Sequence, residues 1–347
     1  MMPLMTPVEL PERRLQITPQ TRLVLLGSCF ATHIGARLRG AGLRTEVNPF
    51  GVLYNPESIA LAVDALLDGD VKENWFFYGR DNLWHSWLHS TEYSAPDKDA
   101  CLKRVEERFT AAREMLLQAD VVCFTFGTNR VYEYEGRVVG NCHKQPAAQF
   151  KERQLGIAEI VTRWRTLLKR LHEANPKLQV LFTVSPYRYA KYGFVENQRA
   201  KATLLLAVEQ LVNEERLTVN GERLTVNGER LTVNEERLTV NGERLTGGGM
   251  PNVSYFPAYE IQLDELRDYR FYAEDMLHPS EQAVTYIWQR FSSWAFTPEA
   301  VKFSQEWERT GRDLAHRPLN PDSEAHKAFL KKALERREKL KLLLLDN

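Results

Sequence analysis

Ser28 has the residue type and the position that nucleophilic chemistry requires. It stands in Gly27-Ser28-Cys29-Phe30-Ala31, where a short apolar run changes to residues at helical spacing. Backbone N–H groups at the start of a helix suit a nucleophile that meets an anionic transition state. Serine is also a preferred N-cap residue, so a helix cap without catalysis is the alternative. The G-x-S-x-G elbow of α/β-hydrolases is absent, because Phe30 occupies the position of the second glycine.

Asp275 and His278 begin and end the tetrapeptide D-M-L-H near the other end of the sequence. In a turn, such a pair can face each other, with the carboxylate bonded to one imidazole nitrogen and the other nitrogen facing a nucleophile. The motif follows the last predicted strand, and Ser28 follows the first one. Because the carboxyl ends of parallel strands meet at one edge of a sheet, we predict all three side chains on one rim.

The four cysteines are Cys29, Cys101, Cys123 and Cys142, and no two of them form a C-x-x-C pair. Four cysteines in so long a chain are a poor disulfide framework, which favours a reduced, intracellular protein. Cys29 is itself a candidate nucleophile, because the first turn of a helix lowers the pKa of a thiol. One step along the helix turns its side chain roughly 100° away from that of Ser28, so buried packing is the alternative.

Histidines form a second candidate cluster. His85 and His89 are four residues apart, as two metal ligands on a helix would be, and His143 lies in the block N-C-H-K. The glutamate of a zincin motif is missing between the first two, and no acidic third ligand has a suggestive spacing. Flanking tryptophans indicate a pocket wall or the core. We therefore predict no metal, and retain Asn141, His85, His89 and His143 as candidate substrate contacts.

The elements that must position these residues alternate between short apolar strands and amphipathic helices, which is typical of a parallel sheet covered by helices. Right-handed crossovers between five such strands predict an α/β fold with a doubly wound parallel five-stranded sheet. Strands are expected at 23–26, 44–47, 121–126, 180–184 and 253–256, and helices at 30–41, 55–67, 98–118, 157–171, 197–212 and after Pro279 and Pro298.

Residues 212–246 interrupt this order with five tandem heptamers of the type V-N-[GE]-E-R-L-T. The valine and leucine positions fall on different helix faces, which argues against a coiled coil. The Asn-Gly copies suit type I′ hairpin turns, so a small β-meander is sterically allowed. Near-perfect repetition indicates a recent duplication. A tolerated surface expansion and a role in binding or oligomerisation both remain open.

Three further segments complete the expected organisation. Residues 1–20 are an N-terminal extension, and residues 21–295 form the α/β domain that the heptamers interrupt. Residues 296–347 are an additional helical extension, whose last helix begins near Ser323 and is basic and amphipathic. Such a helix either packs its leucines on the domain or lies on a membrane surface.

Several motifs occur in an order that resembles the GSCFA domain family, which is named for the pentapeptide at 27–31. The resemblance covers about residues 21–295. That family is grouped with the SGNH hydrolases, so the resemblance implies a flavodoxin-like sandwich with a serine after the first strand and a D-x-x-H motif near the end. The other blocks that carry the resemblance are Asn48-Pro49-Phe50-Gly51, Asn55-Pro56, Thr125-Phe126-Gly127-Thr128, Asn141-Cys142-His143-Lys144, Ser185-Pro186 and Asp275-Met276-Leu277-His278.

The resemblance assigns roles to the residues already singled out. It implies that Ser28 is the nucleophile, that His278 is the general base and that Asp275 orients the imidazole. It also implies an oxyanion hole made by the Ser28 N–H, a loop glycine and an asparagine side chain.

Two positions correspond to the remaining oxyanion donors of the SGNH pattern. Gly51, in the N-P-F-G loop, is the candidate glycine, and Asn129 is the candidate asparagine because it follows the central strand. Arg130 stands where the SGNH pattern has an aspartate. This departure leaves Asn141 as a second candidate for the side-chain donor.

Composition limits the class of partner. Lys plus Arg (46) balance Asp plus Glu (46), so nucleic acid is not the expected partner. No apolar run is long enough to span a bilayer, and the amino terminus has no signal-peptide pattern, so we expect a cytoplasmic protein. We predict a cofactor-independent serine esterase or deacylase acting on a small-molecule or glycan ester. Alternatives are an acyltransferase with the same triad and a non-catalytic ligand-binding module.

Overall fold

The computed structural model describes residues 6–219, 251–319 and 323–344, and the dipeptides at 225–226, 229–230, 239–240 and 243–244. A five-stranded sheet with the strand order β14-β9-β5-β1-β2 forms its centre. All of its neighbouring pairs are parallel. In chain order this is the 2-1-3-4-5 arrangement of flavodoxin-like folds, which confirms the predicted sheet. The strands are β1 (Arg22–Gly27), β2 (Arg44–Val47), β5 (Val121–Phe126), β9 (Gln179–Val184) and β14 (Asn252–Tyr255).

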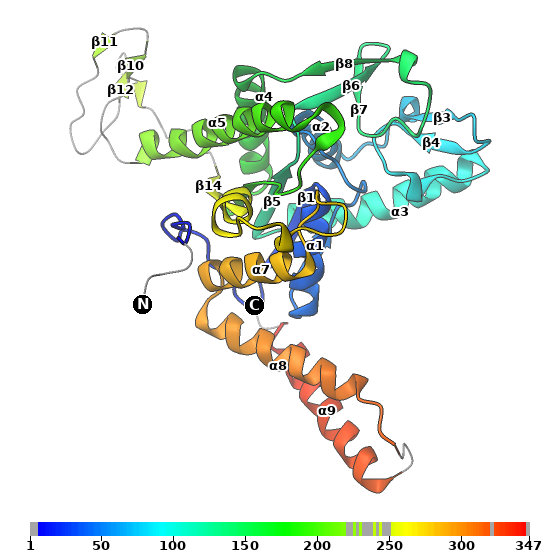
Figure 1. Cartoon of the computed structure of the whole chain (residues 1–347), viewed down its shortest axis with the longest axis vertical. Coiled ribbons are helices and arrows are strands. Elements are labelled where there is room, and N and C mark those ends of the chain that lie inside the picture. The colour runs from blue at the N-terminus through cyan, green and yellow to red at the C-terminus, as the bar shows by residue number, and fades with distance from the viewer. Residues whose placement is uncertain are drawn as a thin grey trace.

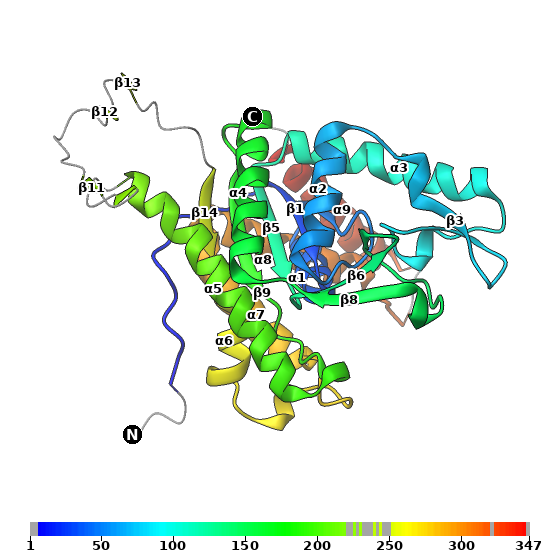
Figure 2. The ribbon, with the colours of Figure 1, turned by 90° about the horizontal axis from the view of Figure 1, so that it is seen from above.

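Alternate residues of each strand enter two separate hydrophobic cores, because successive side chains of a strand point to opposite faces of the sheet. On one face, Val24 and Phe124 pack against the helices α2, α3, α4 and α5. On the other face, Leu25 and Cys123 pack against α1 and α7. Figure 1 shows α4 and α5 above the sheet and α1 and α7 below it, and Figure 2 shows the same layers from above.

The helices begin where local caps allow them to. Asn55 caps α2 by accepting the N–H of Ser58, and Pro56 is its first residue, as the Asn-Pro pair predicts. These helices are α1 (Cys29–Gly40), α2 (Pro56–Asp68), α3 (Lys98–Leu117), α4 (Ile157–Ala174), α5 (Phe194–Val219), α7 (Glu281–Ala295), α8 (Pro298–Ala315) and α9 (Glu324–Leu342).

Two small antiparallel units were not expected from the sequence. Strands β3 (Phe76–Tyr78) and β4 (Trp84–Ser86) form a hairpin, and β6 (Arg130–Tyr134), β7 (Arg137–Val139) and β8 (Phe150–Gln154) form a second sheet. The hairpin strands have three residues each, and the strands of the second sheet are short and carry charged residues, so the hydrophobic periodicity of both units is weak. The helical spacing considered for His85 and His89 is therefore wrong, since His85 lies on β4 and His89 lies in the turn after it.

The heptamer region is described only in part. Helix α5 continues through the first heptamer to Val219. Two dipeptide pairs are antiparallel, β10 (Thr225–Val226) with β11 (Glu229–Arg230) and β12 (Thr239–Val240) with β13 (Glu243–Arg244). The rest of the meander considered for residues 212–246 lies outside the described residues.

Helices α8 and α9 pack against each other as a hairpin that projects from the α/β sandwich (Figure 1). Arg336 pairs with Asp313 at 2.9 Å, and the guanidinium of Arg337 lies 4.0 Å from the ring centre of Trp307. Among the described helices, none combines the length and the apolar character needed to cross a bilayer.

Candidate functional site

Ser28 lies at the carboxyl end of β1, at the point where the strand order reverses between β1 and β5. Gly27 precedes it with a φ of 146°, and a Cβ there would lie 2.3 Å from the carbonyl oxygen of Thr125. Only glycine allows this approach of the two strands. Ser28 caps α1: its Oγ accepts the N–H of Phe30 at 3.3 Å, and its own N–H donates to Thr125. The residue is 1% exposed.

Cys29 follows Ser28 and is half-buried. Burial raises the pKa of its thiol, although the N–H groups of Phe30 and Cys29 and the charge of Lys201 act in the opposite direction. A raised pKa keeps the thiol protonated, which disfavours Cys29 as a nucleophile. The charge of Asp275 also raises the pKa of the Cys29 thiol, so the Asp275 carboxylate lies within electrostatic range of the start of α1.

Asp275 and His278 are in direct contact within a tight loop. Asp275 Oδ2 lies 2.5 Å from His278 Nδ1, while Oδ1 accepts the N–H groups of Leu277 and His278. The N–H and imidazole of His278 and the N–H of Leu277 lower the pKa of Asp275 to about 2. The carboxylate is therefore ionised at neutral pH. Both side chains are about two-fifths exposed, at 43% and 41%.

Tyr187 and Arg188, which follow β9, connect the Asp275–His278 loop to the start of α1. The N–H of Arg188 donates to Leu277, and its guanidinium donates to the carbonyl of Met276. The ring of Tyr187 packs on His278 with 4.2 Å between the centroids. Burial raises the pKa of Tyr187, and the charges of Cys29 and Asp275 add to this increase. Tyr187 thus lies between the two parts of the site, which its sequence position after Ser185-Pro186 does not by itself reveal.

Ser28 and His278 form no direct hydrogen bond in the part of the chain that the structure describes, because Ser28 Oγ is bonded to the α1 backbone. That cap bond is worth about 1 kcal/mol, so a rotation that frees the hydroxyl has a small cost. The catalytic roles of the three residues stay predictions.

Lys201 is a second residue that sequence reasoning missed. It lies on α5 with 1% exposure, and its Nζ donates to the carbonyls of Gly127 at 2.8 Å and Ser185 at 2.7 Å. It therefore joins the residues that follow β5 and β9, next to Ser28 and Tyr187 in the chain segments of the site. Burial lowers the pKa of this ammonium to about 7. A lysine within a helical apolar pattern resembles any surface lysine in the sequence, so only the fold reveals its position.

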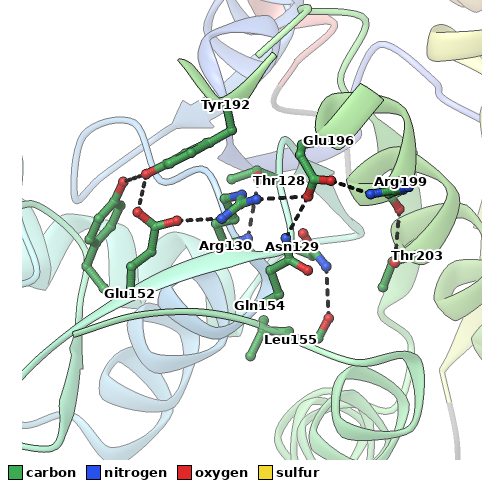
Figure 3. Close-up of polar contacts among 11 residues, drawn as sticks. Thr128, Asn129, Arg130, Glu152, Gln154, Leu155, Tyr192, Glu196, Arg199 and Thr203 are labelled. Carbon is green, nitrogen blue, oxygen red and sulfur yellow. Dashed lines mark hydrogen bonds and ion pairs between the residues drawn. The ribbon is translucent and has the colours of Figure 1, made fainter. Parts of the chain in front are cut away.

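The proposed oxyanion donors already have partners within the chain. The N–H of Gly51 donates to Asn48 across a turn with a φ of 79° at the glycine. Asn129 Nδ2 donates to the carbonyl of Leu155, and its Oδ1 is buried with no partner among the described residues (Figure 3). Asn141 Oδ1 accepts the N–H of His143. The Gly51 N–H and one N–H of Asn129 are thus already bonded in this conformation, and the oxyanion roles of both residues stay predictions.

Arg130, the residue that departs from the SGNH pattern, forms the centre of an ion-pair cluster. Its guanidinium pairs with Glu152 at 2.6 Å and with Glu196 at 3.1 Å, and it stacks 3.9 Å from the ring centre of Tyr192. Figure 3 shows Tyr192 also bonded to Glu152. Arg130 therefore links strand β8 to the start of α5 beside Asn129.

The three retained histidines are buried together under the β3–β4 hairpin. His85, His89 and His143 are 0%, 1% and 5% exposed, and the rings of His85 and His143 lie 4.5 Å apart. His85 lies between Asp81 and Ser94, and His89 stacks on Phe50. Their burial is that of core residues, whereas Asn141 lines a surface cavity. Among the described residues, no group of three or more His, Cys, Asp or Glu side chains could hold a metal.

Comparison with protein families assigns the chain. The model described as GSCFA family matches residues 22–219 and 237–291. The chain belongs to the GSCFA family. A second model, described as GSCFA domain protein, C-terminal domain, matches residues 307–346, which lie in the α8–α9 hairpin and the residues after it. The GSCFA family model leaves residues 220–236 unmatched, and these lie within the heptamers.

Solved structures and curated proteins add little to this assignment. One similar structure is a carbohydrate esterase family 3 protein from Talaromyces cellulolyticus, with 9% identity and a TM-score of 0.33. Another is an acetyl esterase mutant with acetate ion, with 10% identity and a TM-score of 0.31. Each match covers 82% of this chain and 99% of the other. No curated protein matches the chain.

Proposed function

We propose that this GSCFA protein is an SGNH-type serine hydrolase that cleaves an ester, with an O-acyl group on a carbohydrate as the favoured substrate. The observation that supports the proposal is the position of Ser28 at the strand-order reversal, together with an ionised Asp275 that bonds His278 Nδ1 and acts electrostatically on the adjacent Cys29. Ligands of open α/β sheets bind at this reversal.

In the proposed mechanism, Ser28 Oγ attacks the ester carbonyl while His278 Nε2 takes the hydroxyl proton. Asp275 stabilises the resulting imidazolium through Nδ1. The tetrahedral intermediate then expels the alcohol, which receives the proton from His278, and an acyl-enzyme remains. Water, deprotonated by His278, attacks the acyl-enzyme, releases the acid and restores Ser28.

Groups around Ser28 and His278 have supporting roles in this mechanism. The N-terminal end of α1 supplies partial positive charge next to Ser28, which favours the developing oxyanion. Tyr187 packs on one side of the His278 ring and limits its rotation. The Ser28 N–H, Gly51 and Asn129 are the proposed oxyanion donors; the two backbone N–H groups would have to exchange their present partners for the substrate oxygen, whereas Asn129 Nδ2 carries a second N–H.

Covalent labelling by a fluorophosphonate probe tests the proposal. The wild-type protein should be labelled, and Ser28→Ala should not be. His278→Ala should react roughly 10²–10⁴-fold more slowly, because the general base is lost. Cys29→Ala is the matched control, since it changes the adjacent side chain at the same helix terminus and should be labelled like the wild type.

Two outcomes contradict the proposal. Absence of labelling in the correctly folded wild type excludes an activated serine. Equal labelling of Ser28→Ala places the reactive group elsewhere, and loss of labelling in Cys29→Ala alone identifies the thiol as the nucleophile.

A further inference from the structure

A surface cavity of about 520 Å³ adjoins the candidate site, between the loops after β1 and β5 and the β6–β8 sheet. Tyr54 and Thr128 line the side nearest to Ser28. The carbonyl of Tyr54 accepts the N–H groups of Gly127 and Thr128, and a Cβ at Gly127 would lie 3.5 Å from the Ser28 Cβ. The cavity therefore begins one residue away from the proposed nucleophile. Its volume is typical of small-molecule sites.

Tyrosines connect His278 to the same cavity. Tyr187, which packs on His278, lies 6.2 Å from Tyr189 in an edge-to-face contact. Tyr189 lines the cavity and lies 6.1 Å from Tyr192, which covers Arg130. The cavity thus lies next to the Ser28 side of the site, and the Tyr189–Tyr187 pair connects its wall to His278.

The charges on the cavity wall are largely balanced. The charged lining residues among those described are Arg130, Glu152 and Lys191. Arg130 is committed to Glu152 and Glu196 (Figure 3), and exposed Lys191 donates to the hydroxyl of Tyr132. Burial acts to raise the pKa of Glu152, but hydrogen bonds from Tyr192 and Arg130 lower it overall, so the carboxylate is ionised. An anionic group would therefore find no uncommitted guanidinium.

The wall also alternates between apolar and polar groups. Phe150 and the tyrosine rings offer apolar faces, while Asn141, Gln145 and Glu152 offer hydrogen-bonding groups between them. A long acyl chain requires a continuous apolar wall, because an alkyl chain cannot satisfy polar groups that it covers. A ring with an apolar face and hydroxyl edges satisfies both parts of the wall.

We infer that this cavity binds the alcohol part of the ester, and that this alcohol is a neutral polyhydroxylated ring, such as a sugar unit. The inference rests on the proposed function. The ring of this alcohol would lie against Tyr132 and Tyr189. Its hydroxyl groups would bond Asn141 and the Arg130–Glu152 pair, and its acylated oxygen would point toward Ser28.

Three acetate esters separate the features of the alcohol. An acetylated methyl glucoside has the ring and the hydroxyls, cyclohexyl acetate has only the ring, and ethyl acetate has neither. For the wild type, kcat/KM should decrease in that order. In Tyr132→Leu and Gln145→Leu, kcat/KM for the glucoside should fall about tenfold or more, while kcat/KM for ethyl acetate changes less than about twofold.

Tyr78→Leu is the matched control, because Tyr78 is an exposed tyrosine on β3, outside the lining of this cavity, and its removal should change none of the three rates. Equal loss on all three esters in Tyr132→Leu would indicate a structural role and overturn the inference. A wild type that prefers cyclohexyl acetate would overturn it as well.

A binding measurement separates failure of this inference from failure of the proposed function. Saturation-transfer NMR with the acetylated methyl glucoside should detect binding to Ser28→Ala protein, and Tyr132→Leu should weaken it. Sugar binding without fluorophosphonate labelling would retain the subsite and remove the hydrolase. Fluorophosphonate labelling without sugar binding would retain the hydrolase and remove the sugar subsite.

Discussion

Lys201 illustrates how much a single buried residue contributes to this site. Its ammonium holds the carbonyl of Gly127, next to Ser28, and that of Ser185, two residues before Tyr187. The two halves of the candidate site thus share one donor. Burial lowers the pKa of Lys201 from 10.5 to about 7, and the charge of Cys29 acts in the opposite direction; in the described part of the chain, the two carbonyls and the ring of Tyr259 face the ammonium.

The lowered pKa of Lys201 predicts a rise of stability with pH. Between about pH 7 and 10.5 the unfolded chain binds the lysine proton that the folded chain has released, so the free energy of unfolding should increase by about 2 kcal/mol from pH 7 to pH 9. Unfolding by guanidinium chloride at pH 7 and at pH 9 measures this increase in the free energy of unfolding. Lys201→Met should remove the increase, and Lys177→Met, at an exposed lysine, should retain it. An unchanged slope in Lys201→Met contradicts the prediction.

At the scale of elements, the β3–β4 hairpin with its following turn forms a wall beside the N-P-F-G loop. His89 stacks on Phe50 of that loop at 4.6 Å, and His143 Nε2–H donates to the carbonyl of Ser86. Burial lowers the pKa of His89 to about 3 and that of His143 to about 4. Both imidazoles are therefore neutral in the folded protein at physiological pH.

These two histidines predict acid destabilisation of the hairpin. Below pH 6.5 the unfolded chain binds protons that the folded chain excludes, so stability should fall by about 3 kcal/mol between pH 6.5 and pH 5. His89→Asn keeps an amide near the position of Nδ1 without titrating, and it should remove about half of this loss. Urea unfolding at pH 6.5 and pH 5 measures this loss of stability. An equal loss in His89→Asn would contradict the attribution of half of it to His89.

At the scale of the whole molecule, an α/β sandwich carries two additions. The α8–α9 hairpin continues beyond α7 as a separate pair of helices, and the heptamers join α5 to the edge strand β14. The buried parts of α5 and β14, such as Leu204, Leu211 and Val253, lie outside the heptamers. Val212, the first heptamer residue, is partly buried against one core, but none of the described core residues lies between Val219 and Thr246.

Deletion of Val219–Thr246 tests the whole-molecule prediction. Because none of the described core residues lies in this segment, the thermal midpoint should change by less than about 4 °C, which corresponds to about 1 kcal/mol or less in a domain of this size. Fluorophosphonate labelling should not change. Sedimentation velocity serves as the second readout: a changed oligomeric state would instead support the role in assembly.

Local sequence was sufficient to predict the strands of the central sheet, the approximate starts of the helices and the contact between Asp275 and His278. Apolar periodicity, an Asn-Pro cap and a three-residue separation all act between neighbours in the chain, so they can be read without knowing the fold. Short charged strands such as Arg130–Tyr134 escaped this reading, because their pairing rather than their periodicity makes them strands.

Only the tertiary structure decided which polar groups meet around Ser28. Lys201 and Gly127 are 74 residues apart, and Arg130 and Glu196 are 66 apart, so their contacts depend on the path of the intervening chain. The same holds for the bond from Asn129 to the carbonyl of Leu155, which lies 26 residues away in the chain. Sequence specifies residue types along the chain, whereas burial, donor occupancy and pKa depend on what the folded chain brings within a few ångströms.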